Sequence, residues 1–155
     1  MEEQEYKDTY NAVNERRCIF EKTINSRRST CASSRRFHLA DREGIACSSA
    51  AGKALCTELL DRMRSNARFA LHLTSASGPL PHAREIKVQT GGMLGLQSLV
   101  NPERAEYSDV DNIIGVIDRA LQEYQDFDHL PYAVIIQSIV KFEGRRKRSH
   151  PDKKR

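Results

Sequence analysis

Apolar residues recur at helical spacing over residues 48–73. The stripe steps alternately by four and three residues and consists of Cys56, Leu60, Met63, Ala67 and Ala70. This spacing predicts an amphipathic helix with one apolar face. Ser48 and Ser49 precede the stripe and are good N-cap residues, because a serine hydroxyl can accept from the first free N–H groups. The run 74–79 is rich in Ser, Gly and Pro and predicts a linker after this helix.

A glycine-rich stretch follows the linker. Residues 83–88 are expected to form a short helix or strand that Gly91-Gly92 breaks, and residues 93–100 a short apolar helix. The sequence Gly91-Gly92-Met93-Leu94-Gly95 has the outline of a phosphate-binding loop. It lacks the glycine order and the Gly-Lys-Ser/Thr ending that make such loops specific. Close packing of helices at small residues is the favoured interpretation.

Two further helices are expected near the end of the chain. Ser108 is expected to cap a helix that runs to about Tyr124, with a buried face formed by Val110, Ile113, Ile114, Ile117 and Leu121. Pro131 suits the first turn of a last helix over residues 132–142, because its missing N–H is not needed there. The β-branched residues of that segment make a strand the alternative. Gly144 is the expected C-cap.

The first third of the chain has little apolar character. Residues 1–15 are acidic and are expected to be poorly ordered at first and helical toward residues 10–13. Residues 16–47 are rich in Arg and Ser, and eight Lys/Arg face two acidic residues between Arg16 and Arg42. So few apolar side chains are not expected to order this segment by burial alone.

The fold class expected from these patterns is mainly α. A chain of 155 residues is long enough for one domain with a single core. We expect a small single-domain helical protein of about five helices over residues 1–144. A Cys/Arg-rich half (16–73), ordered around a candidate metal site, would precede a conventional helical half (80–143). A basic, disordered tail (145–155) would follow.

The net charge of +4 comes from that tail. Residues 145–155 hold seven Lys/Arg and one Asp, whereas the rest of the chain holds 18 basic and 20 acidic side chains. The candidate nucleic-acid contacts are Arg145, Arg146, Lys147, Arg148, Lys153, Lys154 and Arg155, which would neutralise phosphates. The tail has no aromatic residue to stack on bases, so a solubilising or generally anion-attracting role is the alternative.

The sequence contains no sign of a membrane span or a secretory signal. No apolar run reaches the roughly 18 residues that a spanning helix needs. The acidic start, Met1-Glu2-Glu3-Gln4-Glu5, is unlike the basic start of a secretory signal. A cytoplasmic location with reduced thiols is therefore expected.

The four cysteines are the main chemical feature. Cys18, Cys31, Cys47 and Cys56 all fall between residues 18 and 56, separated by 12, 15 and 8 residues. Four thiolates are the usual ligand set of an iron–sulfur cluster or a structural zinc ion. The absence of a Cys-x-x-Cys pair disfavours zinc ribbons and ferredoxin-type clusters, whose ligands are closely spaced. It favours an iron–sulfur cluster held by single cysteines from separate segments, with zinc as the alternative.

The charge around the cysteines agrees with a metal. A cluster bound by four thiolates is anionic, and arginine pairs at 16–17, 27–28 and 35–36 would offset its charge while metal binding ordered the segment. Inert structural thiols and thiol–disulfide chemistry are the other interpretations. His38 could replace one thiolate in a mixed site.

The function expected from the sequence is that of a small iron–sulfur protein. It would serve as an electron-transfer partner, redox sensor or accessory or assembly factor, together with a partner protein. Enzyme signatures such as a nucleophile elbow or a His-Glu-x-x-His helix are absent from the sequence, so a role other than catalysis is favoured. The alternative is a nucleic-acid-binding or protein-interaction module with a structural zinc or inert cysteines.

Overall fold

The computed structural model describes residues 2–72 and 80–143. The predicted C-cap Gly144 and the basic tail 145–155 lie outside the described residues. So does the whole of the predicted linker 74–79. None of the described helices is long and apolar enough to cross a membrane.

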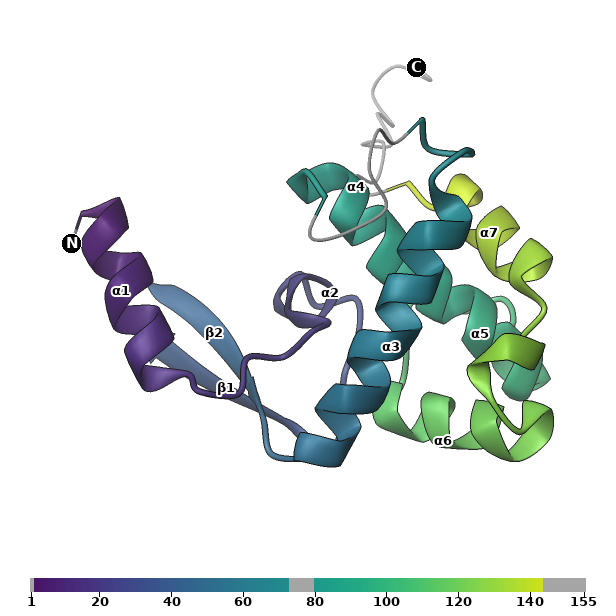
Figure 1. Cartoon of the computed structure of the whole chain (residues 1–155), viewed down its shortest axis with the longest axis horizontal. Helices are drawn as coiled ribbons and strands as arrows, with labels where there is room; N and C mark the ends of the chain where they lie inside the picture. Colours follow the sequence, from purple (N-terminus) through teal and green to yellow (C-terminus); the bar gives the residue numbers. More distant parts are fainter. Residues whose placement is uncertain (1, 73–79, 144–155) are drawn as a thin grey trace, which may run out of the picture.

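The described chain is mainly α-helical with one small antiparallel sheet (Figure 1). The elements are α1 (Glu3–Val13), α2 (Glu21–Asn25), β1 (Ser34–Leu39), β2 (Arg42–Cys47), α3 (Ala50–Ala67), α4 (His82–Ile86), η1 (Lys87–Gly91), α5 (Gly92–Val100), η2 (Pro102–Arg104), α6 (Ile113–Tyr124), η3 (Phe127–His129) and α7 (Tyr132–Lys141). The predicted mainly α fold is confirmed. The predicted helix in the last segment is also confirmed, and its apolar residues Ile135 and Ile139 are fully buried one helical turn apart.

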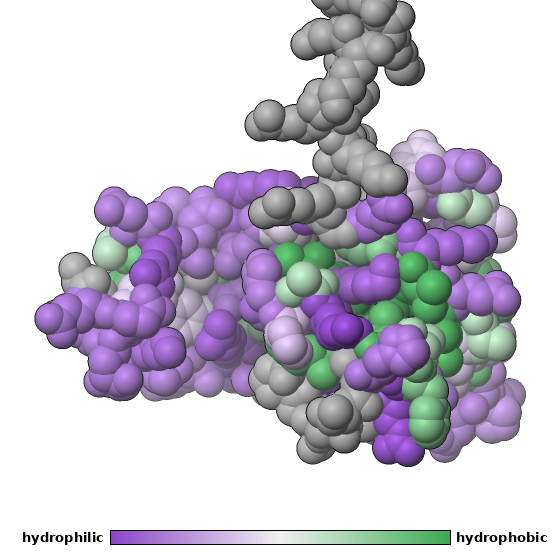
Figure 2. Space-filling view, turned by 90° about the horizontal axis from the view of Figure 1, so that it is seen from above, coloured by the Kyte–Doolittle hydropathy of each residue, from purple (hydrophilic) through white to green (hydrophobic). Residues whose placement is uncertain are grey.

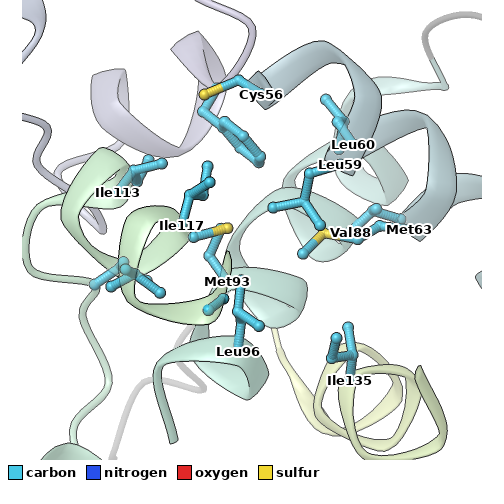
Figure 3. Packing of buried hydrophobic residues seen from close by; sticks show 14 of the residues in the cluster. Cys56, Leu59, Leu60, Met63, Val88, Met93, Leu96, Ile113, Ile117 and Ile135 are labelled. Carbon is cyan, nitrogen blue, oxygen red and sulfur yellow. The ribbon is translucent and has the colours of Figure 1, made fainter. Parts of the chain in front are cut away.

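The core lies among α3, α5, α6 and α7. Leu59, Leu60 and Met63 of α3 are fully buried there, and Figure 3 shows them following one another along the helix with Cys56 at the margin of the cluster. As predicted, α3 is capped by serine: the Ser49 hydroxyl accepts from the N–H of Gly52 at 2.9 Å. This core fixes the position of α3, and with it the position of Cys56.

Gly91-Gly92 was predicted to break the helix, but the helix continues through both glycines. α4 and α5 are joined by η1, a π-helical turn over Lys87–Gly91, and the backbone stays in the right-handed helical region through Gly92. A Cβ on Gly91 would lie 2.7 Å from the Cα of Ile139, and one on Gly95 3.1 Å from the Cα of Ile135. The glycines therefore allow α7 to approach this helix closely, which agrees with the predicted helix packing at small residues.

The start of α6 also differs from the prediction. The helix begins at Ile113, and Asn112, with a φ of 58°, precedes it in place of Ser108. The Asn112 side chain accepts from the N–H of Ala32 at 2.8 Å. Asn112 therefore ties the loop after α2 to the start of α6, and asparagine is one of the residues that tolerates this left-handed conformation.

The largest difference lies in residues 16–47, where no sheet was expected. β1 and β2 form a hairpin in which Ser34 pairs with Cys47 and Leu39 with Arg42. Ala40 adopts a φ of 56° in the connecting turn, a conformation that usually needs Gly or Asn, so the sequence carries no clear hairpin signal. α1 packs beside the hairpin at one end of the molecule (Figure 1), and it begins at Glu3 although poor order was expected there.

Residues 16–47 have their own ordering contacts. Phe20, Ile24 and Ile45 are almost completely buried and belong to the same core as α3. The Glu21 carboxylate is buried beneath the hairpin, where it accepts from the N–H of Ile45 at 2.8 Å. Contacts within the chain itself therefore hold this segment in the fold. The expectation that residues 16–47 have too few apolar side chains to be ordered by burial is therefore wrong.

Candidate functional site

All four cysteines line one small cavity. Cys18, Cys31, Cys47 and Cys56 come from four separate segments: the loop before α2, the loop before β1, the end of β2, and the second turn of α3. The rest of the wall is largely apolar and includes Phe20, Ile24, Ile113 and Ile114. The clustering of cysteines in the sequence thus corresponds to a clustering in space. Whether the cysteines bind a metal stays a prediction.

A backbone ladder brings Cys18 beside Cys47. The N–H of Cys18 donates to the carbonyl of Ile45 at 3.0 Å, and the N–H of Cys47 donates to the carbonyl of Arg16 at 2.8 Å. Arg17 and Ala46 pair between these two bonds as an isolated antiparallel bridge. The segment that carries Cys18 therefore adds to the hairpin edge as a very short third strand.

Cys31 is held at the same end of the hairpin by a tight turn. Its carbonyl accepts from the backbone N–H of Ser34 at 3.1 Å and from the Ser34 hydroxyl at 2.7 Å. Ser34 in turn pairs with Cys47 in the sheet register. The turn and the register together place Cys31 near Cys47.

Cys56 completes the set from the opposite wall. α3 begins directly after β2, so Ser49 at the helix N-cap is only two residues from Cys47. The Cys47 thiol donates to the Ser49 carbonyl at 3.2 Å. Cys56 is buried on the apolar face of α3 (Figure 3), and the positive N-terminal end of this helix points toward the hairpin end that carries Cys47.

The buried thiols are protonated at neutral pH in the metal-free protein. Burial raises the pKa of Cys18 to about 12, although the Phe20 backbone N–H that donates to its sulfur acts in the opposite direction. Burial also raises the pKa of Cys56 to about 12, and the other three thiols raise it further.

The thiols surround the cavity without converging on one point. Among residues 2–72 and 80–143, no three His, Cys, Asp or Glu side chains are grouped closely enough to hold a metal ion. The free space between the walls is about 20 Å³, which is enough for about one water-sized sphere. Metal binding would therefore require the cysteine-bearing loops to adjust.

Lys53 is the charged residue that lines this cavity. It lies on α3 one helical turn before Cys56 and is partly buried, and no ion pair joins it to another described residue. An ammonium group here would offset the negative charge of thiolates. No local pattern in the sequence links Lys53 to the cysteines, because their relation depends on the contact between the hairpin and α3.

A buried polar network supports the loop that carries Cys18. Glu85, only 1% exposed, accepts two hydrogen bonds from the Arg64 guanidinium at 3.0 and 2.8 Å. Gln89 donates to Glu85 at 2.6 Å and to the carbonyl of Ile19 at 3.3 Å, and its side-chain oxygen accepts from the N–H of Thr23 at 3.1 Å. These residues were also missed, although polar Gln89 and Thr90 within an apolar helix were a signal of a buried network.

Other sequence-predicted candidates lie away from the cavity. His38 is exposed on β1, 3.9 Å from a carboxylate oxygen of Glu43, and does not line the cavity. Of the arginine pairs, Arg16 contacts a cysteine residue, donating to the backbone carbonyl of Cys47 at 3.3 Å. Arg27 and Arg36 form ion pairs with Glu43 instead. Comparisons with protein-family models, with curated proteins and with solved structures gave no match for this chain.

Proposed function

We propose that the chain is a small iron–sulfur protein whose cluster is held by Cys18, Cys31, Cys47 and Cys56, and that it serves a partner protein as an electron carrier or redox-sensing accessory. The observation that carries the proposal is the lining of one cavity by all four thiols. Four free cysteines from unrelated segments would otherwise be expected in separate parts of the core.

The spacing of the cysteines in the sequence favours a multi-iron cluster over a single zinc ion, since no Cys-x-x-Cys pair is present. Zinc draws four sulfurs to about 2.3 Å from one centre, and no such convergence is found among the described residues. A cluster needs its ligands farther apart, around a larger core. Three of the ligands lie on loops or at a strand end, and these segments would have to move apart to admit it, because the cavity holds about one water-sized sphere.

The surroundings fit an anionic group. Lys53 lines the cavity, the Phe20 N–H donates to the Cys18 sulfur, and α3 directs its positive end toward the hairpin end. Hydrogen bonds to cluster sulfurs and nearby positive charge stabilise such groups and set their potential. When bound, the cluster would supply one-electron transfer. The chain's own residues hold it and limit water access.

The test is anaerobic reconstitution with iron and sulfide, monitored by visible absorbance and by iron, sulfide and zinc analysis. Wild-type protein is expected to gain absorbance with iron and sulfide bound, and each of Cys18→Ser, Cys31→Ser, Cys47→Ser and Cys56→Ser to lose most of it. Ser33→Ala is the matched control, since Ser33 lines the same cavity without a thiol. A colourless protein that binds zinc through the same cysteines would refute the cluster, and a protein that binds neither metal would refute the site.

A further inference from the structure

A groove leads from the surface to the cysteine cavity. It has a volume of about 810 Å³ and extends over α1, α2, α3 and α4. Cys18 and Lys53 line both the groove and the cavity. Of the four cysteines, Cys18 is the one that lines this groove. The groove is therefore a route by which another molecule can approach the proposed cluster on its Cys18 side.

The groove carries an excess of positive charge. Its two arginines are neutralised within the protein, Arg17 by Glu21 at 2.7 Å and Arg64 by Glu85 at 2.8 Å. Three lysines remain along its walls, and none forms an ion pair with another described residue: Lys7, Lys22 and Lys53. The remaining carboxylate of the groove, Asp61, contacts Arg64 at 3.4 Å.

Its shape and lining fit a protein segment. The walls include the half-buried apolar residues Ile19 and Leu80, which can contact apolar side chains between acidic ones. No aromatic ring lines the groove, so bases would have no platform on which to stack. The exposed Asp61 carboxylate would also repel a continuous phosphate backbone. The surrounding surface, formed by α1 and the hairpin, is almost wholly hydrophilic, whereas apolar surface gathers over the helical half (Figure 2).

We infer that this groove binds an acidic segment of a partner protein, which contacts Lys7, Lys22 and Lys53 and reaches the surface beside Cys18. Complementary charge would steer the encounter and fix its orientation. The inference rests on the proposed function for the role of Cys18 as the contact point. The binding of an acidic segment can be measured without a metal.

The probe is a fluorescein-labelled peptide of about ten residues, half of them glutamate, added to the full chain. Its affinity is measured by anisotropy, and its contacts are mapped by carbodiimide cross-linking and mass spectrometry. The double variant Lys7→Glu/Lys22→Glu is expected to weaken binding about tenfold and to reduce its salt dependence. Cross-links are expected at the groove lysines. Lys141→Glu on α7 is the matched control, because this exposed lysine lies outside the groove.

Cross-links confined to residues 145–155, with affinity unchanged in Lys7→Glu/Lys22→Glu, would overturn the inference. So would tighter binding of oligothymidylate than of the peptide at these lysines. The measurements are made on metal-free and reconstituted protein. Peptide binding in the groove without any cluster forming would support the docking surface and refute the proposed function. A formed cluster without peptide binding in the groove would refute the docking surface alone.

Discussion

The backbone N–H of Cys47 donates to the carbonyl oxygen of Arg16 at 2.8 Å. This bond closes a short ladder between the hairpin and the segment before α2, and the ladder sets Cys18 beside Cys47. Because Ser49, the N-cap of α3, lies two residues after Cys47, the same ladder also links Cys18 to the start of the helix that carries Cys56. The arrangement of the thiols therefore depends on non-local pairing of the N-terminal segment with β2.

Arg64→Met is expected to destabilise the protein by roughly 3–5 kcal/mol, because it would leave the buried Glu85 carboxylate without its charged partner. The free energy of unfolding is measured by urea denaturation. Arg62→Met on the same helix is the control and should cost less than about 1 kcal/mol, since the acidic partners of Arg62 are exposed. Equal losses in the two variants would contradict the buried network.

Gly91→Ala is expected to reduce the free energy of unfolding by roughly 1–3 kcal/mol, the usual effect of overpacking. The new methyl would meet the backbone of Ile139 at 2.7 Å, and a backbone atom cannot rotate away. Gly115→Ala is the comparison, because its methyl would meet side-chain atoms of Asn112 and no backbone atom. A stability gain in Gly91→Ala would show that α7 does not pack closely against the π-helical turn.

The buried Cys56 thiol makes the metal-free protein less stable at alkaline pH. Its pKa is about 12 in the folded chain against an ordinary value of 9.0, so its contribution is fully present below pH 9 and is lost as pH rises toward about 12. Relative to Cys56→Ser, the reduced wild-type protein should lose roughly 1.4 kcal/mol per pH unit in this window. Parallel stability curves for the two proteins would show that the thiol is not buried.

The helices were largely predictable from the sequence, whereas the hairpin was not. α3 carries a regular apolar stripe and a serine cap, so local spacing defines it. β1 and β2 carry arginines at positions where alternation would need apolar residues, and Ala40 gives no turn signal. Their order comes from the buried Glu21 and from Phe20, which are separated in the sequence from the strands that they support.

The sequence alone predicts which residues could form the site, the four cysteines, but not how they are arranged in space. The sequence places four cysteines within a short window, and the structure confirms that they share a cavity. Their contacts depend on the ladder between Cys18 and β2 and on the turn at Cys31, which no local pattern encodes. Lys53 and Gln89 could not have been assigned to the site, because their relation to it arises from tertiary packing.

The iron–sulfur site is tested most directly by the iron, acid-labile sulfide and zinc content of the full chain purified without exposure to oxygen. We expect a coloured protein with iron and sulfide in equal amounts and little zinc, and loss of both iron and sulfide in Cys56→Ser. A colourless, folded wild-type protein without iron or sulfide under the same conditions would contradict it.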